Sequence, residues 1–160
     1  MVFDTARAAS TRALCKVLLP FWCGLIYAYR YFLILEIEAV KLAIQRAHEE
    51  ELITLEKFAK KIHSTSLEEY QEKDYDLEFH VCIAEATHNQ AMLEIIKQLM
   101  NLLKELRQKA LIDKQYFKKS CEEHISIVNA IRNRNASLAS ELMYKHISGI
   151  KEAVLSNELL

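Results

Sequence analysis

The sequence predicts an all-α protein, an antiparallel helical bundle of about six to seven helices. Only two glycines and one proline occur in 160 residues, so tight turns are few and long helices are favoured. Apolar residues make up 51% of the chain and recur at helical spacing, and no stretch shows the sustained alternation of a strand. A chain of this length is expected to fold as one well-packed domain.

Polar residues between the apolar segments mark where the helices should begin and end. Ser66 has the pattern of an N-cap, with Glu69 placed to complete a capping box. Asn89 is a stop signal between two apolar segments, and Asn135 can cap the helix that follows it. The expected helices cover about 30–47, 49–62, 67–87, 90–112, 116–133 and 136–156.

Charge and cysteine content exclude some classes of protein. The chain has 21 basic and 22 acidic residues, so no overall field favours nucleic acid or an acidic membrane surface. The four cysteines form no Cys-x-x-Cys pair and are typical of buried free thiols in a reduced cytosolic protein. A cytoplasmic protein without a membrane partner is therefore expected.

Residues 1–29 are expected to form an N-terminal segment that is distinct from a helical domain at 30–160. The uncharged run "VLLPFWCGLIYAY" in this segment follows three basic residues, Arg7, Arg12 and Lys16. This layout is that of a signal peptide, but the run is too short to span a bilayer and no small-x-small cleavage site follows it. A helix packed on the domain, or a poorly specified leader, is the preferred interpretation.

Three of the expected helices place ionisable side chains on their apolar faces. In "DYDLEFH", Asp76 and His80 lie one helical turn apart on the inward face, beside Phe79. His124 and His146 each lie in the middle of the apolar stripe of a later helix. Buried ionisable groups require partners, because an unpaired buried charge costs several kcal/mol.

The spacing of the two later histidines suggests a shared site. Their helices are joined by the short turn "RNRNA" and should pack antiparallel. His124 and His146 are both 11 residues from Asn135, so they should lie at the same height. With Asp76 and His80 they form an Asp/His/His/His set that suits zinc, nickel or manganese.

A hydrogen-bonded core role is the ordinary one for a single histidine on an apolar face, and it remains open for each of these residues. Two level histidines together with an inward Asp/His pair leave a metal site and that ordinary role equally open on spacing alone. The other three histidines, His48, His63 and His88, lie at helix ends and are expected to be caps or surface residues.

Two stretches carry a family resemblance. "DLEFHVCIAEATHNQAMLEII", followed by "CEEHISIVNAIRNRNASLASELMYKHI", resembles the FCD domain, the effector-binding half of FadR-type GntR transcriptional regulators. The shared features are an Asp-x3-His motif, a later Asn, and an interval of 22 residues between the last two histidines. The resemblance extends over about residues 30–156.

The resemblance implies a divalent metal bound by Asp76, His80, His124 and His146, most simply zinc, with nickel or manganese as alternatives. It also implies a small carboxylate effector at open positions of the metal, and a homodimer. Asn89 matches the family's Asn and is a candidate effector ligand, with a role as a helix stop equally open. Members often have an Arg four residues before the Glu that matches Glu36; Phe32 occupies that position here, so no ion pair to the effector is expected from it.

The function predicted from these features is effector sensing by a metal-dependent domain of a GntR/FadR-type regulator, and not catalysis. Direct DNA binding by this chain alone is not expected, because a winged helix-turn-helix needs three helices and a hairpin, more than residues 1–29 provide. Two alternatives remain: a metal-dependent enzyme, or a structural dimerisation module with a buried polar network. Metal analysis and turnover assays distinguish them.

Overall fold

The computed structural model describes residues 3–158, and the side chains of residues 24–154 among them. These residues form eight helices and no strand, which confirms the predicted all-α class. The helices are α1 (Phe3–Arg46), α2 (Glu49–His63), α3 (Leu67–Glu72), α4 (Tyr75–Glu85), α5 (Gln90–Leu102), α6 (Lys104–Ala110), α7 (Lys114–Arg132) and α8 (Ala136–Glu158).

Two of the expected helices are each broken in two. The segment expected at 67–87 divides into α3 and α4 because Asp74 adopts a left-handed backbone conformation, with φ of 48°. The segment expected at 90–112 divides at Leu103 into α5 and α6. Short polar side chains such as Asp tolerate the left-handed region better than most residues, so this break left only a weak signal in the sequence.

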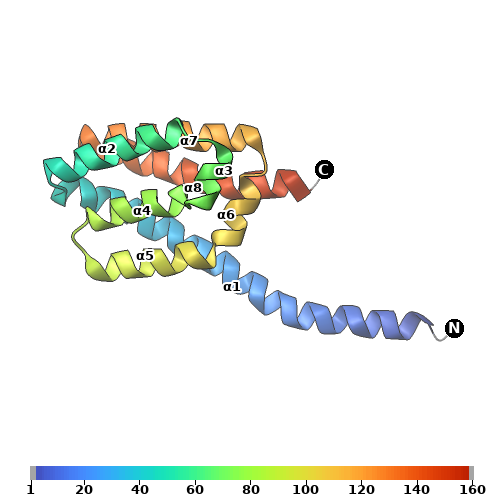
Figure 1. The fold of residues 1–160 in the computed structure, drawn as a ribbon. Coiled ribbons are helices and arrows are strands. Elements are labelled where there is room, and N and C mark those ends of the chain that lie inside the picture. Colours follow the sequence, from blue (N-terminus) through green and yellow to red (C-terminus); the bar gives the residue numbers. More distant parts are fainter. Residues whose placement is uncertain (1–2, 159–160) are drawn as a thin grey trace.

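The first helix begins much earlier than expected. α1 starts at Phe3 and passes through the expected boundary at residues 29 and 30 without interruption. Its N-terminal half extends away from the bundle, as Figure 1 shows. The side chains of Arg7, Arg12 and Lys16 lie outside the described part of the structure. None of the described helices combines the length and the apolar character that a membrane crossing would require.

The predicted caps are present, with one change of partner. The Ser66 hydroxyl accepts a hydrogen bond from the Glu69 amide at 3.2 Å, and the Asn135 side chain accepts one from Leu138 at 3.1 Å. Glu69 does not close a capping box; its carboxylate accepts hydrogen bonds from the hydroxyls of Thr65 and Tyr75 instead. α3 ends after six residues, and the Tyr75 hydroxyl at the start of α4 lies 2.8 Å from the Glu69 carboxylate.

The antiparallel pair of α7 and α8 packs against α2 and α1. α7 and α8 form a hairpin; α2 packs on α7, α1 packs on α8, and α4 packs on α1, α2 and α5 (Figure 1). A hydrogen bond from the Tyr29 hydroxyl to the Ile147 carbonyl ties α1 to α8 at 2.9 Å. α7 and α8 approach closely at Gly149, where a Cβ would lie 3.1 Å from the Tyr116 ring. The hairpin and α4 therefore enclose a common interior.

Candidate metal centre

The four predicted ligand residues meet in that interior. Asp76 and His80 lie on α4, His124 on α7 and His146 on α8, and they are only 7%, 1%, 0% and 1% exposed. One potential ligand atom from each residue lies within 4.8 Å of the corresponding atoms of the other three. The structure thus brings together residues that are up to 70 positions apart in the sequence.

The distances within the cluster suit a single ion. The Nε2 atoms of His124 and His146 are 3.2 Å apart, and His124 Nε2 lies 3.6 Å from Asp76 Oδ1. Two nitrogens bound to one zinc at the usual bond lengths, in a tetrahedral arrangement, lie about 3.4 Å apart. The equal distance of the two histidines from the α7–α8 turn produces this convergence, as the spacing predicts.

Two further carboxylates hold the outer nitrogens of the histidine rings. His146 Nδ1 lies 3.1 Å from Glu123 Oε2, and His80 Nδ1 lies 2.9 Å from Glu36 Oε2. A carboxylate on one ring nitrogen fixes the tautomer that presents the other nitrogen as a lone-pair donor, which is the usual arrangement around metal-bound histidines. These contacts favour ligation through the two Nε2 atoms.

Glu36 on α1 is a further buried carboxylate at this cluster, and its burial calls for positive charge nearby. It is fully buried on α1, and neither of its oxygens has a well-aligned hydrogen-bond donor, although His80 lies within ion-pair distance. Burying a carboxylate in this way is costly unless positive charge lies nearby. A protonated His80 ring would supply that charge, and so would a divalent ion held by the four predicted residues, so the residues present fit a metal.

Asp76 is held in place by two other side chains. Arg107 Nη1 lies 2.8 Å from Asp76 Oδ2, and the Tyr70 hydroxyl donates a hydrogen bond to Oδ1 at 3.0 Å. Burial by itself would raise the pKa of Asp76, but the nearby His124 ring and the Arg107 charge outweigh it and hold the pKa well below the usual range. Asp76 is therefore an ionised carboxylate, the form that binds metals.

The histidines differ in their affinity for protons. Burial and the neighbouring His146 ring lower the pKa of His124 to about 4, so His124 is neutral at neutral pH. Burial would also lower the pKa of His80, but the Glu36 charge outweighs it and raises that pKa. The two imidazoles therefore differ: the pKa of His124 lies below its usual value, and the pKa of His80 lies above its usual value.

Aromatic side chains cover the cluster. The Phe79 ring lies 4.1 Å from that of His124, and the Phe32 ring meets His80 edge-on at 5.3 Å, both measured between centroids. Phe32 is the residue that occupies the position of the family's Arg, and it is completely buried. Phe32 therefore contributes an apolar ring against His80 at this position, and no positive charge.

Sequence reasoning missed several residues of the centre. Glu36 shares a helical face with buried Ala39 and Val40, so periodicity alone would have revealed it as an inward carboxylate. Arg107 has no sequence relation to Asp76 that could have indicated the pair. A helical wheel drawn through the expected helix at 67–87 predicts Asp74 on the solvent face, and this prediction is wrong. The Asp74 side chain is 18% exposed and pairs with Arg107 at 3.0 Å, because the left-handed turn redirects it.

Asn89 lies apart from the four residues. Its side chain caps α5 by accepting a hydrogen bond from the Met92 amide at 3.2 Å, beyond the end of the helix α4 that carries His80. It lines a surface hollow with His88 and Gln90, and none of the four clustered residues lines that hollow. Its role as a helix stop is thus visible, and its contact with an effector stays a prediction.

Fold and site together define an α-helical domain with a buried Asp/His cluster whose geometry could hold a metal ion. The family model of the FCD domain matches residues 27–149, so the chain belongs to the FCD domain family. The Uxu operon transcriptional regulator of Escherichia coli is 31% identical over 85 residues, which are 50% of this chain and 33% of that protein. The Uxu operon regulator of Haemophilus influenzae is 22% identical over 124 residues, 74% of this chain and 46% of that protein.

Two solved structures share this fold. E. coli McbR/YncC has a TM-score of 0.70 at 15% identity, over 84% of this chain and 65% of that chain. The metal-free FCD domain of the transcriptional regulator TM0439 has a TM-score of 0.69 at 15% identity, over 84% of this chain and 94% of that one. The chain spans less than half the length of the two Uxu regulators, and almost all of the isolated FCD domain.

Proposed function

We propose that this chain is the effector-sensing domain of a GntR-type transcriptional regulator, and that Asp76, His80, His124 and His146 hold a divalent metal ion. The observation that carries the proposal is the convergence of these four side chains, with the Nε2 atoms of His124 and His146 3.2 Å apart in a buried site. The family membership and the likeness to the Uxu regulators support the regulatory role.

Zinc suits the set best, because it commonly takes four ligands drawn from His nitrogens and carboxylate oxygens. Nickel and manganese are alternatives, since they also accept imidazole and carboxylate ligands. Bound there, a divalent ion would supply net positive charge that attracts an anion. Arg107 already neutralises part of the Asp76 charge, which strengthens that attraction. We therefore infer that the effector is a small organic acid, recognised through its carboxylate, and that Asn89 is a candidate contact for it.

The same proposal extends to the organisation of the protein. The ligand-binding domain comprises residues 30–160, and residues 1–29 form a separate N-terminal segment despite the continuity of α1. A second copy of the chain is the proposed partner, and exposed apolar side chains on one side of α1 support this: Ile26, Tyr27, Tyr31 and Ile34. Effector binding would favour one arrangement of that dimer, and no catalytic step is assigned to the centre.

The test compares metal-loaded and metal-free protein in calorimetric titrations with a panel of small mono- and dicarboxylic acids. The corresponding neutral amides serve as matched controls, because they keep the size and shape of each acid without its charge. We expect at least one acid to bind the metal-loaded chain and to bind the metal-free chain at least about tenfold more weakly, since the ion supplies the attraction. Equal binding to both forms, or binding of the amides, would overturn the assignment.

A further inference from the structure

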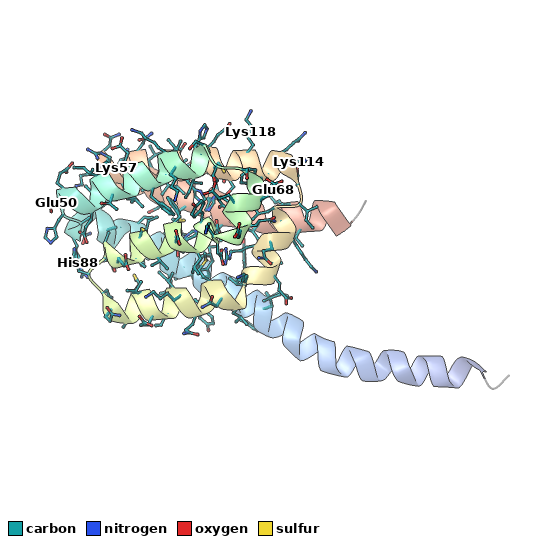
Figure 2. The ribbon with its side chains drawn as sticks, in the orientation of Figure 1. Glu50, Lys57, Glu68, His88, Lys114 and Lys118 are labelled. Carbon is teal, nitrogen blue, oxygen red and sulfur yellow. The ribbon has the colours of Figure 1, made fainter. Side chains whose placement is uncertain are left out.

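We propose that His48, Glu51 and His88 form a second divalent-metal site, on the surface at one end of the bundle. His48 precedes α2, Glu51 lies in the first turn of α2, and His88 follows α4. Figure 2 shows the labelled His88 at the same end of the bundle as Glu50, which neighbours Glu51 in the sequence. This site does not depend on the buried centre and shares no residue with it.

The three side chains are already close to a ligating arrangement. One potential ligand atom from each lies within 4.8 Å of those of the other two. His88 Nε2 lies 3.1 Å from Glu51 Oε2, and the rings of His48 and His88 are 5.0 Å apart between centroids. Two ligand atoms bound to one first-row metal ion lie about 3 Å apart, so only the exposed His48 ring needs to turn.

The backbone beneath the cluster is fixed by one local and two long-range hydrogen bonds. Arg46 Nη1 donates to the Thr87 carbonyl at 3.0 Å, which joins the turn after α1 to the turn after α4. The His48 amide donates to Glu51 Oε2 at 2.8 Å, and Arg134 Nη2 donates to the Ala47 carbonyl at 3.2 Å. A metal bound by the three side chains would therefore meet a pre-organised frame, which lowers the entropic cost of binding.

The local charge and access also suit a cation. Glu49, Glu50 and Glu51 form the first turn of α2 and offset the positive end of its helix dipole. Hollows adjoin the cluster, one lined by Glu51 and another by His88, with Glu85 shared between them. Two imidazoles and one carboxylate select nickel, zinc, copper or cobalt over calcium or magnesium, and leave positions for water or an external donor.

The experiment is a calorimetric titration of the tag-free, chelator-treated chain with Ni²⁺. Wild type is expected to bind Ni²⁺ at two classes of site. In His88→Ala the affinity of the weaker class, which is the surface site, should fall at least tenfold. His63→Ala is the matched control, because His63 is also exposed but lies at the other end of α2. Identical titrations of His88→Ala and His63→Ala would overturn the proposal.

A second comparison separates this site from the buried one. In a His124→Ala background the surface site should persist, and the further change His88→Ala should remove it. Substoichiometric Cu²⁺ added to wild type should broaden the amide NMR signals of residues 48, 51 and 88 first. This measurement identifies the site in wild type even if circular dichroism shows that the His124→Ala chain is unfolded. Broadening confined to other parts of the chain would contradict the assignment.

Discussion

At the scale of single residues, the buried cluster includes two carboxylates besides the four predicted ligand residues. Glu36 and Glu123 lie against the outer nitrogens of His80 and His146, at 2.9 and 3.1 Å. Burial would raise the pKa of Glu123, but the His146 ring outweighs it and lowers that pKa, so Glu123 remains a charged acceptor. Such partners orient the rings and increase their basicity toward a metal.

Replacing Glu36 with Gln should weaken metal binding and change its pH dependence. The pKa of His80 is raised in the metal-free protein, so His80 keeps its proton to higher pH and an incoming ion must displace it. Metal affinity in wild type should therefore fall as pH is lowered through that raised pKa. In Glu36→Gln the pKa should drop, fewer protons should be released on binding, and affinity should fall about 10- to 100-fold.

Calorimetry in buffers of different ionisation enthalpy measures both the affinity and the protons released. Glu38→Gln is the control, because Glu38 lies exposed on the same helix and forms an ion pair with Lys41. Its replacement removes a carboxylate from α1 without touching the buried cluster. If Glu36→Gln released as many protons on metal binding as wild type, Glu36 would not be the group that raises the pKa of His80.

At the scale of elements, the break between α3 and α4 and the position of α6 create the support for Asp76. The left-handed Asp74 ends α3 and turns its carboxylate toward Arg107 on α6, which also reaches Asp76 and the Met100 carbonyl. Arg107 is only 4% exposed. This three-way contact joins α4, α5 and α6 around one buried guanidinium.

Arg107→Met should destabilise the metal-free protein by about 3–5 kcal/mol, because it leaves the Asp76 carboxylate buried without its charge partner. The pKa of Asp76 is held below its usual range, so the stability that this residue contributes is present above the unfolded pKa and is lost as pH falls. The difference between wild type and variant should accordingly shrink below about pH 4.

Urea unfolding at several pH values gives these free energies directly. Lys104→Met is the matched control: Lys104 lies 3.6 Å from Asp74 but is 49% exposed, so its loss should cost less than about 1 kcal/mol. A loss in Arg107→Met no larger than in Lys104→Met would show that the buried pair contributes nothing to stability.

Helical periodicity predicted most of these elements but not their breaks. The inward faces of 116–133 and 136–156 were predictable because each segment is one uninterrupted helix. A single helical-wheel projection therefore describes the whole of each segment. The turn at Asp74 shifts the phase between α3 and α4, and a wheel drawn across it places Asp74 in solvent. Contacts such as Arg107 with Asp76 depend on how three helices meet, which no local pattern in the sequence encodes.

At the scale of the whole molecule, the chain offers a bundle with a polar centre and a nearly neutral charge. Residues 3–46 form one continuous helix, so the described part of this region is not a winged helix-turn-helix. The formal net charge is −1, and the ion pairs on exposed helix faces mix both signs. Phosphate binding requires a concentration of basic side chains, whereas the ion pairs on the described helix faces set an acidic group beside each basic one.

The 160-residue chain should therefore show no sequence-specific binding to duplex DNA at physiological salt, with or without an organic acid. A gel-shift titration against promoter fragments from its own genomic neighbourhood measures this, with an excess of unrelated duplex as competitor. A discrete complex that resists the competitor at submicromolar protein would mean that the chain itself reads DNA.

The most direct measurement of the central claim is native mass spectrometry of chain purified without chelator and passed over a chelating resin to remove weakly held ions. Wild type and His63→Ala should each retain one divalent ion per chain, whereas His124→Ala and His146→Ala should retain none while their circular dichroism stays helical. If the two buried-site variants kept as much metal as wild type, or if wild type kept none after loading with zinc, the four side chains would be a buried polar network and not a metal centre.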